Sequence, residues 1–176
     1  MKSRIKLAAH DLFWLNPNAP DDQCAHGTIE FTVNGIEFVT CKSGELTVTG
    51  AALFLLRTLT CDHTRAHPVA PYNTLFPHCG YAAWPYEGEF EVLLMGCDLG
   101  VEVWVSHEVA GIRLVSSAGS ELVTEEEWRV AVLGLAEQVS AYYRQCSPKA
   151  EIKDDYERQG WAAFWLEWDK LLPKAC

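Results

Sequence analysis

The sequence lacks any long run of apolar residues. Nowhere do the roughly eighteen consecutive apolar residues of a membrane-spanning helix occur, so we expect no membrane span. The first residues carry bases, as a secretory leader does, but His10 and Asp11 interrupt the apolar run and leave it too short for a signal core. These absences predict a soluble, cytoplasmic protein.

Closely spaced cysteine pairs are also missing. The seven cysteines are an odd number, and no two of them form a C-x-x-C motif. In a chain without a leader, widely spaced cysteines are typical of reduced thiols in a cytoplasm. They are Cys24, Cys41, Cys61, Cys79, Cys97, Cys146 and Cys176.

Positive charge is scarce, above all in the second half of the chain. The formal net charge is -10; residues 1–80 hold seven acids and six bases, whereas residues 81–176 hold seventeen acids and eight bases. Nucleic-acid binding depends on Lys and Arg side chains that neutralise phosphates, so this balance disfavours DNA and RNA. It favours a basic protein partner. The alternative is that the negative charge serves solubility alone.

The common catalytic signatures are absent as well. There is no G-x-S-x-G motif, and the glycines follow neither the G-x-G-x-x-G nor the Walker spacing. We therefore expect no nucleotide cofactor and favour a non-enzymatic protein.

The chain does contain enough apolar sequence for one core. Its 176 residues are 49% apolar and 22% charged, which is typical of a globular domain. The clearest local pattern is residues 28–40, where two alternating runs flank an Asn-Gly pair that favours the type I′ turn of a hairpin. If residues 34–35 form that turn, Phe31 faces Phe38 on the apolar side.

Four further runs have β-like composition. They are residues 45–48, 89–95, 101–107 and 112–116. Glycine-containing turns separate the last three runs and predict a meander.

Three segments have helical patterns. An apolar stretch at 51–59 predicts a buried helix, and a Thr124–Glu127 capping box begins a second helix. A third helix covers about residues 153–172, where Gly160 costs roughly 1 kcal/mol relative to Ala. The order of elements predicts a single α+β domain over residues 1–176. Its antiparallel sheet of about five to six strands, a hairpin plus a meander, would carry one central helix and two C-terminal helices on one face.

Residues 61–86 form an unusually long connection, and such connections are often functional. They include five potential zinc ligands, namely Cys61, His63, His67, His78 and Cys79. The first two histidines would share a face on one helical turn, but Pro68 disfavours a helix there. The last two ligands are adjacent, and adjacent side chains rarely point at one ion. A zinc site is therefore one hypothesis, and ordinary loop histidines are the other.

Carboxylates and aromatic residues meet where this connection ends. Glu87, Glu89 and Glu91 alternate with apolar residues, which predicts that they project from the solvated side of a strand. Trp84 and Tyr86 precede them, and Trp and Tyr are frequent anchors in protein interfaces. We take these five residues as the candidate partner-binding set.

Residues 97–108 (CDLGVEVWVSHE), the capping box and the closing helix with its Trp-Leu-Glu-Trp at 165–168 resemble a type of small uncharacterised bacterial protein. The acidic, Trp-rich character is also similar to that of immunity proteins that neutralise bacterial toxins. The resemblance covers about the last eighty residues and concerns their general character. It therefore implies a protein-binding role but assigns no functional residue.

Three hypotheses follow. The leading one is a non-enzymatic binding protein whose acidic half engages a basic protein in a bacterial cytoplasm. The second is a small enzyme or metal-binding protein that uses the Cys/His residues of 61–86. The third is a homodimer that buries the last helix, whose stripe of Trp161, Phe164, Trp165 and Trp168 is otherwise explained as a core seam.

Overall fold

The chain forms several antiparallel β-sheets and three α-helices, so the predicted α+β class is confirmed. The computed structural model describes residues 4–16, 22–80, 82–97, 99–146, 149 and 151–172. Within these residues, no helix combines the length and the apolar character that crossing a membrane requires.

The first sheet is built around β2 (His26–Val33), which pairs with β1 (Ile5–Phe13), β3 (Ile36–Val39) and β4 (Leu46–Thr47). Asn34 and Gly35 have φ angles of 52° and 87°, which confirms the predicted hairpin turn. The predicted register is correct next to the turn, where Val33 faces Ile36, but an irregularity between Phe31 and Thr32 places Phe31 opposite Val39 instead of Phe38.

The other strands do not extend this sheet, so the single sheet expected from the sequence is replaced by separate ones. A three-stranded meander consists of β9 (Trp104–Glu108), β10 (Gly111–Ser116) and β11 (Gly119–Val123). Two short pairs join β5 (Phe76–Pro77) to β8 (Gly100–Val101) and β6 (Ala82–Pro85) to β7 (Val92–Met95). The run at 89–95 leaves the predicted meander because the Tyr86 N–H bonds to the Glu91 carbonyl at 3.0 Å and turns the chain back onto β6.

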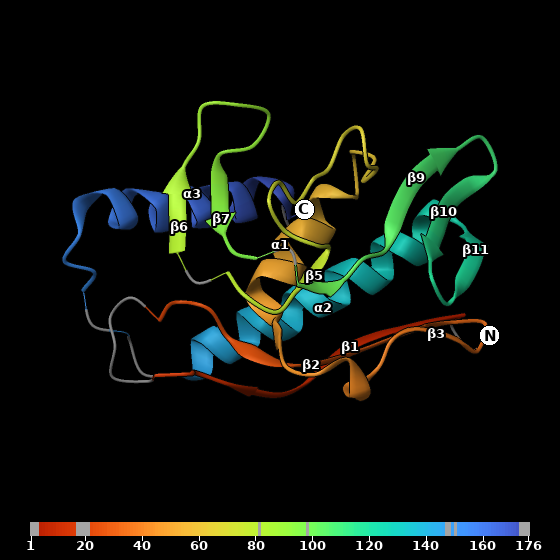
Figure 1. Ribbon diagram of the computed structural model, residues 1–176, viewed down its shortest axis with the longest axis horizontal. Coiled ribbons are helices and arrows are strands. Elements are labelled where there is room, and N and C mark those ends of the chain that lie inside the picture. The colour runs from red at the N-terminus through yellow and green to blue at the C-terminus, as the bar shows by residue number, and fades with distance from the viewer. Residues whose placement is uncertain are drawn as a thin grey trace.

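The helices pack against different β structures. All residues of α1 (Val48–Arg57) are buried, and α2 (Glu125–Gln145) begins at the predicted capping box of Thr124 and Glu127. A 3₁₀ turn covers Cys41–Ser43. Figure 1 shows α1 and α2 on one side of the first sheet, with α3 (Asp155–Leu171) farther away beside the β6–β7 hairpin. The sequence analysis predicted that the two C-terminal helices would pack on one face of one sheet. They pack instead against different β structures.

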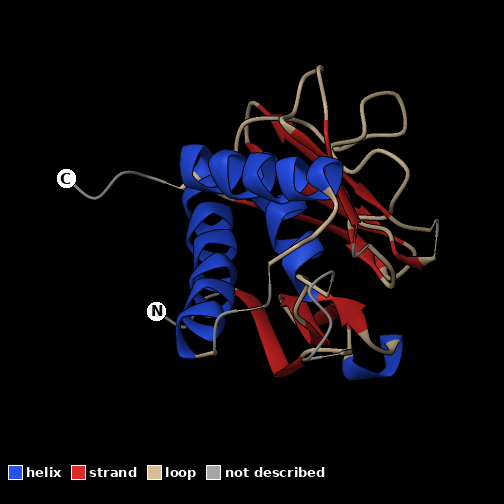
Figure 2. Ribbon diagram, turned by 90° about the vertical axis from the view of Figure 1, so that its left-hand side faces the viewer, coloured by secondary structure: helices blue, strands red, loops and turns tan. Residues whose placement is uncertain are grey.

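The aromatic stripe of α3 is a core seam, as predicted. Trp161, Phe164 and Trp168 are buried, and the Trp165 ring packs edge to face on Tyr143 of α2 with 4.8 Å between ring centroids. Figure 2 shows α3 running across the direction of α2. The chain's own residues therefore cover the apolar side of α3 that a homodimer would use.

Gly160 explains how α3 approaches the hairpin so closely. A Cβ at this position would lie 1.8 Å from the carbonyl oxygen of Ala83 in β6 and 2.8 Å from the Trp84 nitrogen. The helix-propensity cost of this glycine is therefore offset by contact between the helix and the strand backbone.

We expect Gly160→Ala to lower the free energy of unfolding by about 1–3 kcal/mol, because the added methyl group must push β6 away from α3. Gly134→Ala in α2 is the matched control, since a Cβ there would meet nothing within 4 Å. It should raise stability by up to about 1 kcal/mol. Urea unfolding of both variants measures the difference, and an equally stabilising Gly160→Ala would show that the close approach is unimportant.

Candidate protein-binding surface

The loop between β6 and β7 projects from the body of the molecule (Figure 1). Trp84 at its start is 41% exposed and Tyr86 is 42% exposed, while Glu87 and Glu89 are exposed beside them. Tyr156 in the first turn of α3 lies against Trp84, with ring centroids 6.2 Å apart, and is itself 52% exposed. We call these five residues the hairpin surface.

The predicted acidic strand face is wrong, because the three glutamates do not line one strand. Glu87 and Glu89 lie in the bends before β7, which begins only at Val92. Gly88 separates the two glutamates, and a Cβ there would lie 2.2 Å from the Tyr86 ring. The glycine thus lets the tyrosine ring fold over the loop, which breaks the alternation on which the prediction depended.

The three carboxylates also differ in their pairing. Glu91 forms an ion pair with Lys170 of α3 at 2.5 Å. Among the residues that the structure describes, neither Glu87 nor Glu89 has a cationic partner; Glu89 accepts only a long contact from the Cys61 thiol at 3.9 Å. The tip of the loop therefore displays two negative charges without a cationic partner among these residues. Glu91 instead helps to fix the end of the loop to α3.

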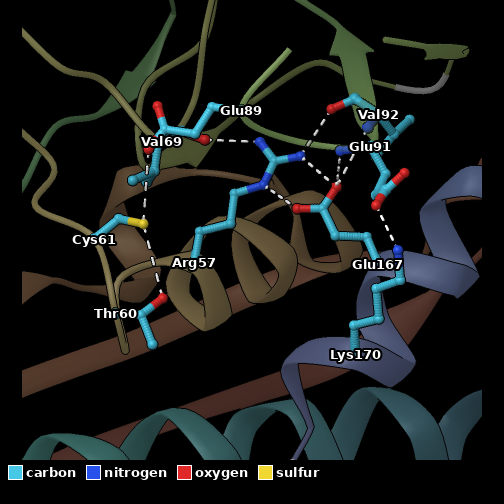
Figure 3. Close-up of polar contacts among 9 residues, drawn as sticks. All are labelled: Arg57, Thr60, Cys61, Val69, Glu89, Glu91, Val92, Glu167 and Lys170. Carbon is cyan, nitrogen blue, oxygen red and sulfur yellow. Dashed lines mark hydrogen bonds and ion pairs between the residues drawn. The ribbon is translucent and has the colours of Figure 1, made fainter. Parts of the chain in front are cut away.

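A buried ion pair beneath the loop fixes its position (Figure 3). The Arg57 guanidinium donates to both carboxylate oxygens of Glu167, from Nε at 2.7 Å and from Nη2 at 3.0 Å. Both side chains are almost completely buried. The pair therefore joins the end of α1 to α3 inside the core, where charges are tolerated only when they are well paired.

The backbone around the loop supplies the remaining partners of this pair. Arg57 also donates to the carbonyl oxygens of Val69 and Val92, both at 2.7 Å, so four of its five donors are used. Glu167 accepts the backbone N–H groups of Glu91 at 3.0 Å and Val92 at 3.3 Å. Helices α1 and α3, the connection at Val69 and the end of the loop thus meet in one network (Figure 3).

A recess of about 210 Å³ opens above this network. Its lining includes Cys61, Glu89, Phe90 and Lys170, and Phe90 stacks on Arg57 with 4.1 Å between the guanidinium carbon and the ring centroid. Because the donors of Arg57 are directed to Glu167 and to carbonyl groups, the guanidinium has little capacity to bind a substrate anion. Its geometry is that of a structural clamp.

The residues considered as zinc ligands lie at separate places. His63 is buried against Trp104, where its Nδ1 accepts the Val69 N–H at 3.1 Å and its Nε2 lies 2.8 Å from Glu102. The backbone donor places the ring proton on Nε2, so both nitrogens are already used. His67 is exposed, and His78 lies beside Gly44.

The sulfur of Cys79, which follows His78 in the chain, lies 2.7 Å from the sulfur of Cys97. Across the described part of the chain, no three His, Cys, Asp or Glu side chains converge as a metal ion needs. The geometry therefore gives no three-ligand set for the zinc hypothesis among these residues.

Comparison with protein-family models, with curated proteins and with solved structures found no significant match. Arguments about function therefore rest on the side chains of this chain alone.

Sequence reasoning named Trp84, Tyr86, Glu87 and Glu89 but missed Tyr156 and the buried pair. A signal for the pair was present: Arg57 ends a helix that is otherwise apolar, and Glu167 lies inside the aromatic stripe of the last helix. A charged residue on each of two buried faces predicts an ion pair between them.

We expect Arg57→Met to lower the free energy of unfolding by about 3–5 kcal/mol, because it leaves the Glu167 carboxylate buried without its counter-ion. Adding Glu167→Leu should restore part of that loss. Lys170→Met breaks the exposed pair with Glu91 a few residues away and should cost less than about 1 kcal/mol. Denaturant unfolding of the three variants provides the measurement, and equal costs for Arg57→Met and Lys170→Met would contradict a clamp.

Proposed function

We propose that this chain is a non-enzymatic binding protein that engages a basic protein through the hairpin surface. The observation that carries the proposal is the exposure of Trp84 and Tyr86 beside Glu87 and Glu89, which have no cationic partner among the described residues, on a loop whose end bonds to the buried Glu167. These are four of the five residues selected from the sequence; Glu91, which pairs with Lys170, is left out, and Tyr156, whose ring contacts Trp84, is included in the proposed surface.

The aromatic residues supply the apolar part of such an interface. Trp and Tyr are enriched among the residues whose removal costs most binding energy, because each buries a large area and keeps a polar atom for a hydrogen bond. Trp84 and Tyr156 already contact each other, so few side-chain rotations are lost on binding. A partner that covers both rings gains area at low entropic cost.

The negative charge of the surface would orient a basic partner and raise its association rate. The formal net charge is -10, and Glu87 and Glu89 stand at the most prominent loop without intramolecular cations among the described residues. Complementary charge speeds encounter and excludes partners of the wrong sign, and salt weakens both effects. A partner with Lys or Arg side chains near an apolar patch fits this surface.

A binding role is favoured over catalysis by what the buried polar groups do. Among the buried groups that could serve acid–base chemistry, Arg57, Glu167 and His63 each bond to another side chain and to the backbone. Asp22 and His26 are also buried; Asp22 accepts the Asn16 N–H at 2.6 Å, and the His26 Nδ1 lies 3.8 Å from the Glu45 carboxylate. A general base must offer a free atom to its substrate. Arg57, Glu167 and His63 serve the scaffold.

The cellular role that fits these properties is an immunity-type inhibitor in a bacterial cytoplasm. The hairpin surface would cover a basic patch of the partner, and complementarity to that patch would provide specificity. The scattered cysteines, of which the six described ones are unpaired, suit a reducing compartment.

We expect affinity capture from the native host, at low salt, to recover a basic protein in stoichiometric amount. Trp84→Ala should then weaken binding of the purified partner roughly 30-fold or more, as loss of about 2 kcal/mol implies. Val109→Ala is the control, since Val109 is fully exposed in the β9–β10 turn, distant from the hairpin. Titration calorimetry or surface plasmon resonance measures both variants.

The charge contribution is tested separately by Glu87→Gln/Glu89→Gln. This change should slow association and flatten its salt dependence. Glu125→Gln/Glu126→Gln removes the same charge at the start of α2 and should have a smaller effect. A partner that binds equally well to the Trp84→Ala and wild-type proteins, or whose binding ignores salt, would contradict the proposal.

A further inference from the structure

Two cysteines meet at the base of the hairpin that carries the hairpin surface. Cys79 lies shortly before β6 and Cys97 shortly after β7, and the pairing of Ala82 with Met95 continues to hold the two segments together. Their sulfur atoms are 2.7 Å apart, close to the bonded separation of about 2.05 Å. No large movement of the backbone is needed to join them.

Glycines beside both cysteines permit this approach. A Cβ at Gly96 would lie 2.7 Å from the Cys79 carbonyl oxygen and 2.0 Å from the Asn73 Oδ1. Gly80 has a φ angle of +144°, in the region that side chains disfavour. The local backbone is therefore specialised for the close contact of these two strand ends.

The contact is specific to this pair. In the part of the chain that the structure describes, Cys24 instead donates to the Gly80 carbonyl, Cys41 is exposed, and Cys61 contacts Thr60 and Glu89. No other two cysteine sulfurs among the described residues are in contact.

Small reagents can reach the pair. Both residues are partly exposed, and Cys97 lines an open recess of about 630 Å³ together with Tyr72 and Trp104. The hydrogen bond with Cys97 and partial burial raise the pKa of Cys79 to about 11, so this residue rests as a thiol at neutral pH. Cys79 and Cys97 thus remain thiols under reducing conditions and are accessible to a small oxidant.

We propose that Cys79 and Cys97 form a redox-sensitive pair whose disulfide staples the base of the β6–β7 hairpin. Its effect on partner binding rests on the proposed function, whereas the disulfide itself does not. Cytoplasmic disulfides are in most cases transient and redox-sensing, so a pair that is reduced at rest and oxidised under stress agrees with the compartment proposed above.

The oxidant is a small-molecule disulfide. One protein thiol loses its proton and attacks a sulfur of the oxidant, which forms a mixed disulfide and releases one small thiol. The second protein thiol loses its proton and attacks the protein sulfur of that mixed disulfide, which forms the Cys79–Cys97 bond and releases the second small thiol. Two protein thiols are oxidised by two electrons, and one small disulfide is reduced to two thiols.

The staple makes the hairpin more rigid. It closes a ring that contains β6, the loop and β7, and the hairpin surface belongs to that ring except for Tyr156. Restricting a loop to its bound conformation improves affinity by lowering the entropy lost on binding. Oxidation therefore strengthens capture of the basic partner.

The experiment treats the full-length protein with oxidised glutathione and maps its peptides without reduction. We expect a cross-link between the peptides of Cys79 and Cys97, a fall of two in the count of free thiols, and slower amide exchange in β6 and β7. Cys79→Ser and Cys97→Ser should each abolish the cross-link, whereas the exposed Cys41→Ser should leave it intact. Separate glutathione adducts on the two cysteines, without a cross-link, would overturn the proposal.

Partner binding then separates the two proposals. If the cross-link forms and slows exchange but no basic partner binds either redox form, the redox pair stands and the binding function fails. If a partner binds in a Trp84-dependent manner but Cys79 and Cys97 never cross-link, the binding function stands and the redox pair fails. Where both hold, the oxidised protein should bind several-fold more tightly than the Cys79→Ser variant treated in the same way.

Discussion

The buried ion pair of Arg57 and Glu167 is the constraint on which the displayed surface depends. It ties α1 to α3 and, through the Glu91 and Val92 backbone groups, to the end of the projecting loop. A loop held only by its own turn would lose conformational entropy whenever a partner ordered it. The buried charges of the pair need the backbone groups of Glu91 and Val92 to complete their hydrogen bonds. The loop and the core therefore stabilise each other.

Polar groups in this protein divide into two kinds. Those inside, such as Arg57, Glu167 and His63, bond to other side chains and to the backbone. Burial strengthens these hydrogen bonds and leaves the groups unavailable to a ligand. Those at the loop, such as Glu87 and Glu89, remain without cationic partners among the described residues and stay available to another molecule. This division supports the proposal that the aromatic and acidic loop contacts a protein partner.

Local determinants were predictable from the sequence, and long-range ones were not. The Asn34-Gly35 turn and the Thr124 capping box depend on neighbours within a few residues, and both formed as predicted. The first strand was not predicted, because its opening residues were considered only as a possible leader, which the short apolar run argued against. The splitting of the sheets depends on contacts between distant residues. In the site, exposed aromatics followed from residue type, whereas the partners of Glu167 are 75 to 110 positions away.

Amide hydrogen exchange in a Glu167→Gln variant tests the central claim most directly. The change keeps the shape of the side chain but removes the charge that holds Arg57 and weakens the acceptor of the Glu91 and Val92 N–H groups. The account predicts that exchange accelerates most at Tyr86, Glu91 and Val92 and much less in the β9–β11 meander. Acceleration spread evenly over the chain, or absent from the loop, would contradict it.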